Sequence, residues 1–193
     1  MRLAVVRLFV SLFGKGAAKP LVLAVLCGAA LSLSGCKMFN KEEPPPCPRV
    51  SILGEADNLF KFKDGGGQTD KDVEFRAKVS GYTGACQYDK DEKTMAVTLG
   101  VRFDAWKGPA MTEPKGHFSY FVAVPAFRGT QDGKKVLTVD FDAPGPQGAR
   151  FSDQDVVISF PVRDVKDLPK YEIFIGMQLD AAQLDYNRKH PLR

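Results

Sequence analysis

The sequence predicts a mostly β protein, an antiparallel two-sheet β-sandwich of about eight strands with one short helix near its C-terminus. Three observations support this fold class. Apolar and polar side chains alternate along most of the chain after residue 47, turn-forming residues separate the alternating segments, and two cysteines are spaced to close a long loop. A period of two is typical of strands that bury one face. Many such strands with short connections favour two packed sheets.

Residues 1–35 have the pattern of an export signal. Four basic residues precede an apolar run over residues 21–33, which is too short to span a bilayer comfortably. The run ends in Leu33-Ser-Gly-Cys36, which resembles the bacterial lipobox. The resemblance implies diacylation of the Cys36 thiol, often with palmitate, and cleavage before it. Two or more acyl chains hold a protein stably to a membrane. An ordinary cleaved signal peptide or a single transmembrane anchor remains the alternative.

Cleavage before Cys36 would leave a neutral chain. The formal charge of +4 comes from 27 basic and 23 acidic residues, and the signal holds four of the basic residues and no acidic one. The basic pI therefore reflects the signal, and it gives no reason to expect nucleic acid as a partner. The remaining residues suffice for a single domain with its own core.

Residues 36–46 are predicted to form a lipidated tether. They carry few apolar side chains and end in three prolines, which favour an extended backbone. Fully stretched, the ten residues after Cys36 reach on the order of 30 Å. The domain then spans residues 47–193 and retains Cys47 and Cys86. Because an exported protein meets an oxidising compartment, this pair is predicted to form a disulfide.

Five segments of the domain alternate clearly. In 73–79 and 95–103 every second residue is apolar, and three further strands are expected over 137–141, 156–162 and 171–179. The side chains expected to point inward in the first two segments are Val73, Phe75, Ala77, Val79, Met95, Val97, Leu99, Val101 and Phe103.

Turn residues separate these strands. Asp132-Gly133 lies between residues 118–128 and 134–142, so the two segments are expected to pair antiparallel. The acidic stretch 89–93 and the Gly/Pro-rich stretch 143–148 predict further turns. Asp167-Leu-Pro-Lys-Tyr171 resembles the tyrosine corner of immunoglobulin-like sandwiches, which implies an immunoglobulin-like (Ig-like) fold.

Residues 180–189 predict the C-terminal helix. Asp180 can accept a hydrogen bond from the Gln183 amide, and the Gln183 side chain can reach back to Asp180. Arg188 and Lys189 suit the negative end of the helix dipole. A helix of this length is marginal alone, so it is expected to dock on the sandwich.

Two longer stretches resemble a known family. They are residues 47–62, which begin Cys47-Pro-Arg-Val-Ser-Ile-Leu-Gly, and residues 171–179, Tyr171-Glu-Ile-Phe-Ile-Gly-Met-Gln-Leu179, which run on to Leu184-Asp-Tyr-Asn-Arg188. Both are similar to segments of small, mostly uncharacterised envelope lipoproteins of alphaproteobacteria. The resemblance implies an envelope lipoprotein and transfers no catalytic residue.

No segment of the sequence predicts catalysis, a metal site or a cofactor. His117 lies at the start of a strand, with no nucleophile or orienting carboxylate that the sequence can assign to it. Gly65-Gly-Gly67 lacks the continuation of a phosphate-binding loop. The acidic residues of 89–92 lack the glycine and distal glutamate of a calcium loop, which favours a solvated turn.

The segment 117–127 is apolar on both faces. Its alternation places some of its large side chains inward and others outward, and a strand of this kind is usually covered on both sides. The outer cover is expected to be the terminal helix through Leu184; the alternative is a partner protein or an acyl chain. The candidate partner surface comprises Phe118, Tyr120, Phe121 and Phe127.

The sequence thus predicts a membrane-tethered, non-enzymatic interaction or structural module of the cell envelope. The residue after Cys36 is Lys37 and not aspartate, which by resemblance to the enteric sorting pattern implies the periplasmic face of the outer membrane. Expected partners are the membrane, through the acyl chains, and an envelope protein. The alternative function is a carrier of a lipid or other apolar ligand inside the sandwich. A hydrolase is a distant third.

Overall fold

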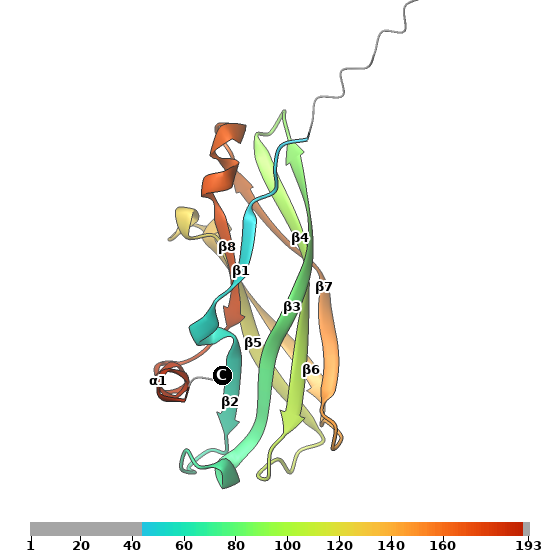
Figure 1. Ribbon diagram of the computed structural model, residues 1–193, viewed down its shortest axis with the longest axis vertical. Helices are drawn as coiled ribbons and strands as arrows, with labels where there is room; N and C mark the ends of the chain where they lie inside the picture. Colours follow the sequence, from blue (N-terminus) through green and yellow to red (C-terminus); the bar gives the residue numbers. More distant parts are fainter. Residues whose placement is uncertain (1–43, 191–193) are drawn as a thin grey trace, which may run out of the picture. The chain divides into compact units, whose positions relative to one another are not determined.

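Residues 44–190, the part of the chain that the computed structural model describes, form a β-sandwich with one short helix (Figure 1). The predicted fold class is confirmed. Two four-stranded sheets face each other. Across one sheet the order is β1 (Arg49–Ile52), β8 (Glu172–Met177), β5 (Lys115–Ala123) and β6 (Lys134–Asp142). Across the other it is β2 (Asn58–Phe62), β3 (Val73–Asp89), β4 (Thr94–Lys107) and β7 (Ala149–Pro161).

One strand pair departs from the antiparallel pattern. β1 pairs with β8 in parallel, so the first and last strands of the described sandwich close one edge of their sheet together. Parallel neighbours need a long connection, and the six intervening strands supply it. The last two strands, β7 and β8, lie in different sheets, whereas the last two strands of an immunoglobulin domain share one.

The strand β4 is the unbroken centre of its sheet. All five side chains predicted to point inward from it are buried, and Leu99, Val101 and Phe103 are completely inaccessible. Both neighbouring strands carry a bulge. Ser80 has no partner in β4, and two residues of β7, Gln154 and Asp155, together oppose Gly100 of β4.

Each bulge moves the alternation by one residue. In β7, Phe151 points inward before the bulge, and Val156 and Ile158 do so after it. Asp155 has a φ of 58°, a left-handed conformation that is uncommon outside glycine. The bulges therefore let strongly twisted neighbours stay in register with β4 over its whole length.

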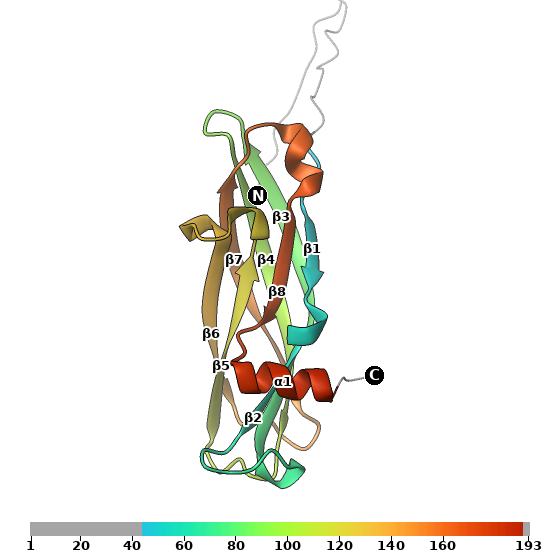
Figure 2. The same cartoon turned by 90° about the vertical axis from the view of Figure 1, so that its left-hand side faces the viewer.

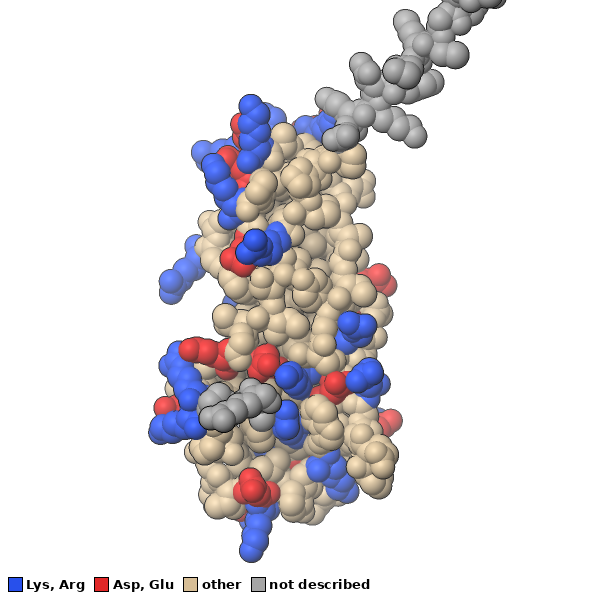
Figure 3. All heavy atoms as spheres, viewed as in Figure 1, with Lys and Arg blue, Asp and Glu red and all other residues tan. Residues whose placement is uncertain are grey.

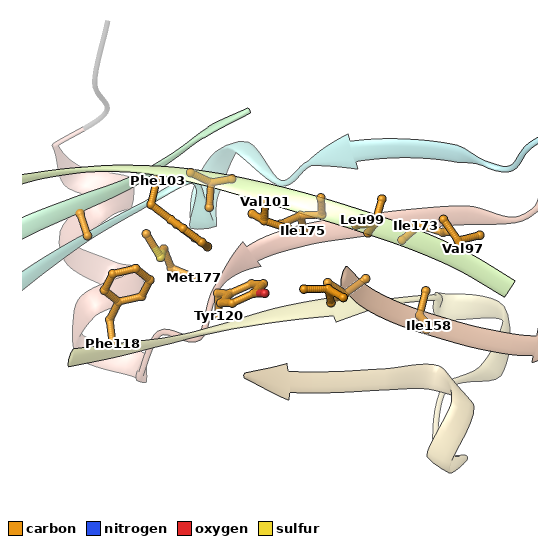
Figure 4. Close-up of a cluster of buried hydrophobic side chains, with 14 of the residues drawn as sticks. Val97, Leu99, Val101, Phe103, Phe118, Tyr120, Ile158, Ile173, Ile175 and Met177 are labelled. Carbon is orange, nitrogen blue, oxygen red and sulfur yellow. The ribbon is translucent and has the colours of Figure 1, made fainter. Parts of the chain in front are cut away.

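Aromatic rings fill the space between the sheets (Figure 4). The Phe103 ring of β4 meets the rings of Phe118 and Tyr120 of β5 at centroid distances of 5.1 and 5.0 Å. Ile175 and Met177 of β8 pack beside them and are fully buried. Such edge-to-face pairs add to the stabilisation that burial of the rings already gives.

One hydrogen bond with a charged acceptor lies at the centre of this packing. The hydroxyl of the buried Tyr120 donates to Oδ2 of Asp153 at 2.8 Å. Burial, with the adjacent carboxylate, raises the pKa of Tyr120 far above its usual value, so the phenol stays protonated and donates. Asp153 lies opposite the inward-facing Val101, directly before the β7 bulge. The bond therefore links β5 of one sheet to β7 of the other.

The predicted disulfide between Cys47 and Cys86 is confirmed, with a Cα–Cα distance of 5.8 Å. It joins the residues just before β1 to β3 of the opposite sheet. The hydroxyl of Tyr82 in β3 also donates to the Val50 carbonyl of β1 at 2.7 Å. β2 pairs only with the first part of β3, so β1 lies beside the remainder of that edge.

The predicted hairpin is also confirmed, because β5 and β6 pair antiparallel from Lys115↔Asp142 to Ala123↔Lys134. Its connection is longer than a two-residue turn and contains two 3-10 turns, η3 (Pro125–Phe127) and η4 (Gln131–Gly133).

Other 3-10 turns are η1 (Gly54–Ala56), η2 (Asp70–Asp72) and η5 (Val165–Lys170). The 89–93 stretch is a turn in which Oδ1 of Asp89 accepts from the amides of Asp91 and Glu92.

The C-terminal helix α1 (Ala181–Lys189) begins where its capping residues predict. The Gln183 amide donates to Oδ1 of Asp180 at 2.8 Å, and the Asp180 amide donates to Oε1 of Gln183 at 3.0 Å. This reciprocal capping box satisfies two amides that the first turn leaves free. Figure 2 shows the helix lying across the strand direction, over the end of the sandwich where β2 runs.

Removing the disulfide should lower the free energy of unfolding by about 4 kcal/mol, because the bond closes a loop over a sequence separation of 39 residues. Urea titration of the Cys47→Ser/Cys86→Ser double variant would measure this loss. Adding a reductant should lower the free energy of unfolding of the unsubstituted protein to that of the double variant. The double variant itself should not respond to the reductant. A difference below about 1 kcal/mol would show that the disulfide contributes little to stability.

Candidate interaction surface

The predicted partner surface is not a continuous exposed patch. Phe118 is 3% exposed and Tyr120 is completely buried, because the inward face of β5 forms the centre of the core. The prediction that these two residues belong to an exposed surface was therefore wrong. Their rings contact Phe103, and a partner could reach them only by opening the sandwich.

The other two residues of that surface lie apart from each other. Phe127 belongs to η3, and its ring packs on Phe160 and Tyr171 at 5.3 and 5.5 Å. Phe121 is half-buried on the outer face of β5, where its ring lies over Gly176 of β8. The Lys134 ammonium sits 4.6 Å from the Phe121 ring centroid. A glycine neighbour and a lysine thus cover Phe121.

The terminal helix docks elsewhere than predicted. It contacts η1 and β2, and its buried anchor is Tyr186 and not Leu184. The Tyr186 ring lies 5.2 Å from Phe60 and 5.1 Å from Phe62, both on β2. β2 is short and lies at a sheet edge, so its outward phenylalanines would otherwise face water. The helix covers them by packing the ring of Tyr186 against both phenylalanines.

Polar contacts hold the helix in the same place. The Asn187 side-chain amide donates to the carbonyl oxygens of Asn58 and Glu55 at 2.8 and 3.2 Å. Arg188 pairs with the Glu55 carboxylate at 2.8 Å. Asn187 is only 6% exposed, so its bonds to the backbone are shielded from water and fix the register of the helix against η1.

Beside the helix, three strands present an aromatic and arginine ladder on the outer face of their sheet. Phe60 of β2 is opposite Arg76 of β3, and Arg76 is opposite Trp106 of β4. The guanidinium carbon of Arg76 lies 5.5 Å from the Phe60 centroid and 4.8 Å from the Trp106 ring. Two cation–π contacts therefore hold the arginine between the rings.

The Arg76 side chain makes no hydrogen bond or salt bridge with a described residue. Its Nε is buried without a partner, and the only other such side-chain atom within residues 44–190 is Oδ1 of Asn58. Burial lowers the pKa of Arg76, and the charge of Asp57 partly opposes this effect. The guanidinium remains charged, because arginine keeps its proton in proteins.

Arg76 and Trp106 border an open groove of about 600 Å³, the Arg76 groove. Its lining carries equal numbers of acidic and basic side chains. Figure 3 shows the two signs interspersed over the lower half of this face, with largely uncharged surface above them along β3. The lining residues are Ile52, Gly54, Asp57, Arg76, Lys78, Val79, Ser80, Asp104 and Trp106.

Both acidic residues of the groove already have partners. Asp57 receives a hydrogen bond from the Asn58 side chain at 2.8 Å and lies 3.5 Å from the Lys78 ammonium. Asp104 pairs with Arg150 at 2.7 Å. Arg76, by contrast, forms no salt bridge with a described residue, although the charge of Asp57 acts on it.

Two further hollows lie around Met111, in the loop that follows β4. One, of about 420 Å³, is lined by Phe75, His117 and residues 111–116 among others. The other, of about 650 Å³, is bordered by Trp106 and by residues 144–146. Neither contains a buried polar atom without a partner among the described residues. The Arg76 groove is therefore the stronger candidate site.

The described residues contain no group of three His, Cys, Asp or Glu side chains placed to hold a metal ion. His117 is exposed near the start of β5, and its side chain makes no hydrogen bond to another described residue. No helix within 44–190 is long and apolar enough to cross a membrane. Cys36, the predicted lipidation site, lies outside the described residues.

No protein-family model matches this chain, and neither a curated protein nor a solved structure matches it.

The pattern of alternation in the sequence did not indicate the Arg76 groove. Arg76 and Trp106 occupy the polar positions of alternating strands, which alternation assigns to solvent without distinguishing among them. The signal that could have found them is their residue type, since a lone tryptophan on an outward position is unusual. Their meeting depends on the register of three strands, which alternation does not give.

The Tyr186→Ala substitution should lower the free energy of unfolding by about 3 kcal/mol, because it removes a buried ring that packs on two phenylalanines. Chemical denaturation of the variant would measure the loss. Lys189→Ala is the matched control on the same helix, since it breaks only an exposed pair with Asp185 and should cost less than about 0.5 kcal/mol. Equal stability of the two variants would mean that the helix does not dock through Tyr186.

Proposed function

We propose that the protein is a lipid-anchored lipoprotein of the bacterial envelope and that its β-sandwich is a non-enzymatic interaction module. The anchor is Cys36, at the end of a lipobox-like signal, and residues 36–46 are the tether. The tether leads directly into Cys47, whose disulfide transfers a pull on the chain to β3. Lys37 favours the periplasmic face of the outer membrane as the location.

The proposal places binding on the outer face of the β2–β3–β4 sheet. The observation that carries it is the Arg76 guanidinium, which lies against two aromatic rings beside an open groove and forms no salt bridge with a described residue. A preorganised, unpaired arginine beside a partly exposed tryptophan is typical of protein interfaces. Trp106 is 37% exposed, so part of its ring is free to contact a partner.

The groove lies at the opposite end of β3 from the tether. Arg76 and Cys86 are ten residues apart on this strand, which corresponds to about 30 Å. The groove is therefore separated along β3 from the point at which Cys47 joins the domain.

The alternative function, a carrier of an apolar ligand, requires a chamber between the sheets. Side chains from both sheets occupy that space, including the fully buried Leu99, Phe103, Tyr120 and Ile175 (Figure 4). Dense packing of this kind leaves little room for a ligand of several hundred cubic ångströms. The filled core therefore favours binding at the surface.

The Cys36→Ser substitution should abolish lipidation, because serine lacks the thiol that accepts the diacylglycerol. Metabolic labelling with palmitate should yield an unlabelled protein of precursor size. Cys27→Ser is the matched control, since Cys27 lies within the signal and its loss should leave labelling intact. A mature-sized, palmitate-labelled Cys36→Ser protein would contradict the lipoprotein assignment.

The Trp106→Ala substitution should reduce partner recovery at least about tenfold, because tryptophans at interface centres carry much of the binding energy. The measurement is cross-linking of the full-length protein in native envelope membranes, followed by quantitative affinity purification. Val136→Ala is the control: Val136 is 52% exposed on β6 of the other sheet. If both variants recover the partner as well as the unsubstituted protein does, binding does not involve the groove.

A further inference from the structure

The tip of the Arg76 side chain is the part that can reach a ligand. Its Nε is buried, whereas the two terminal nitrogens are not among the buried side-chain atoms without a partner. The two cation–π contacts restrain the guanidinium group, so binding would cost little additional side-chain entropy. A planar pair of N–H donors matches the two oxygens of a carboxylate.

The charges around Arg76 select for a single negative charge. Asp57 and Asp104 line the same groove as Arg76 and Lys78, so its formal charge sums to zero. A polyanion, such as nucleic acid or a cluster of phosphates, would place further negative charges against these carboxylates. An isolated carboxylate adds only one negative charge, so it meets less of this repulsion when it pairs with Arg76.

The apolar lining indicates what should accompany that carboxylate. The ring of Trp106 and the half-buried Ile52 line the groove, and Leu53, next to Ile52, is 40% exposed. An apolar side chain next to the carboxylate could cover these surfaces. A long acyl chain fits less well, because the groove is open and charged side chains interrupt its apolar part.

We infer that the Arg76 groove binds a peptide segment of a partner protein in which a glutamate or aspartate side chain adjoins a bulky apolar residue. The carboxylate accepts hydrogen bonds from the terminal nitrogens of Arg76, and the apolar residue packs on Trp106. This inference rests on the proposed function, since it names the chemical class of the partner at the same site.

Trp106 makes the binding directly observable. It is the only tryptophan of the chain, and its ring is in contact with Arg76, so its fluorescence responds to binding in this groove. Trp106 also borders the hollow at residues 144–146, and the Arg76 variants below distinguish the two sites. The probes are acetyl-Leu-Glu-Leu-amide and the uncharged acetyl-Leu-Gln-Leu-amide, each titrated into the full-length protein in detergent. The glutamate peptide should change the Trp106 emission in a saturable manner, and the glutamine peptide should bind at least about tenfold more weakly.

Substitutions of Arg76 test the assignment to this side chain. Arg76→Gln should remove the preference for the glutamate peptide, and Arg76→Lys should restore part of it, because lysine keeps the charge but not the planar donor pair. Arg128→Gln, in the loop between β5 and β6, is the charge-matched control and should bind as the unsubstituted protein does. Circular dichroism spectra of the variants would show that each is folded.

Several results would overturn the inference. Equal affinity of the unsubstituted protein for the two peptides would do so without any variant, as would a glutamate preference that persists in Arg76→Gln. Stronger binding of tripolyphosphate than of the glutamate peptide would assign the groove to polyanions. If only acetyl-Leu-Gln-Leu with a free terminal carboxylate binds, the groove recognises the C-terminus of a chain and not an acidic side chain. If partner recovery still depends on Trp106 in any of these cases, the interaction module stands and only the partner's chemistry is wrong.

Discussion

The sandwich depends on the unbroken alternation of β4. Its inward side chains, from Met95 to Ala105, are all buried, and they provide a continuous apolar surface on which the opposite sheet packs. Both β3 and β7 pair along this strand and adjust to it with bulges. A strand of this length twists strongly, and neighbours without an extra residue would lose their inward register. The bulges confine the irregularity to the two strands beside β4.

The β7 bulge also has a chemical consequence for the core. The alternation shifts by one residue at the bulge, and Asp153, the last inward position before it, lies beside Tyr120. A carboxylate in that position requires a donor, and the buried phenol supplies one. On the opposite, outer side of the same sheet, the in-register stretch before the β3 bulge aligns Phe60, Arg76 and Trp106. Register therefore determines both the polar contact inside and the candidate site outside.

The two ends of the domain have different roles in the proposed function. At one end, the disulfide joins the start of the domain to β3, and at the other the Arg76 groove and helix α1 lie together along β2. Helix α1 packs Tyr186 on Phe60, and Arg76 lies 5.5 Å from the centroid of the same ring, so one phenylalanine connects the helix to the ladder.

The sequence by itself determined the fold class, the inward faces of β3 and β4, the capping of α1 and the Cys47–Cys86 pair, because each follows from local periodicity, local capping chemistry or an even number of remaining cysteines. Only the tertiary structure decided where α1 docks, why Phe118 and Tyr120 are inaccessible, and how Arg76 comes to lie between two rings. Those outcomes depend on which strands become neighbours and in what register. Residues far apart in the chain set both, and no local pattern records them.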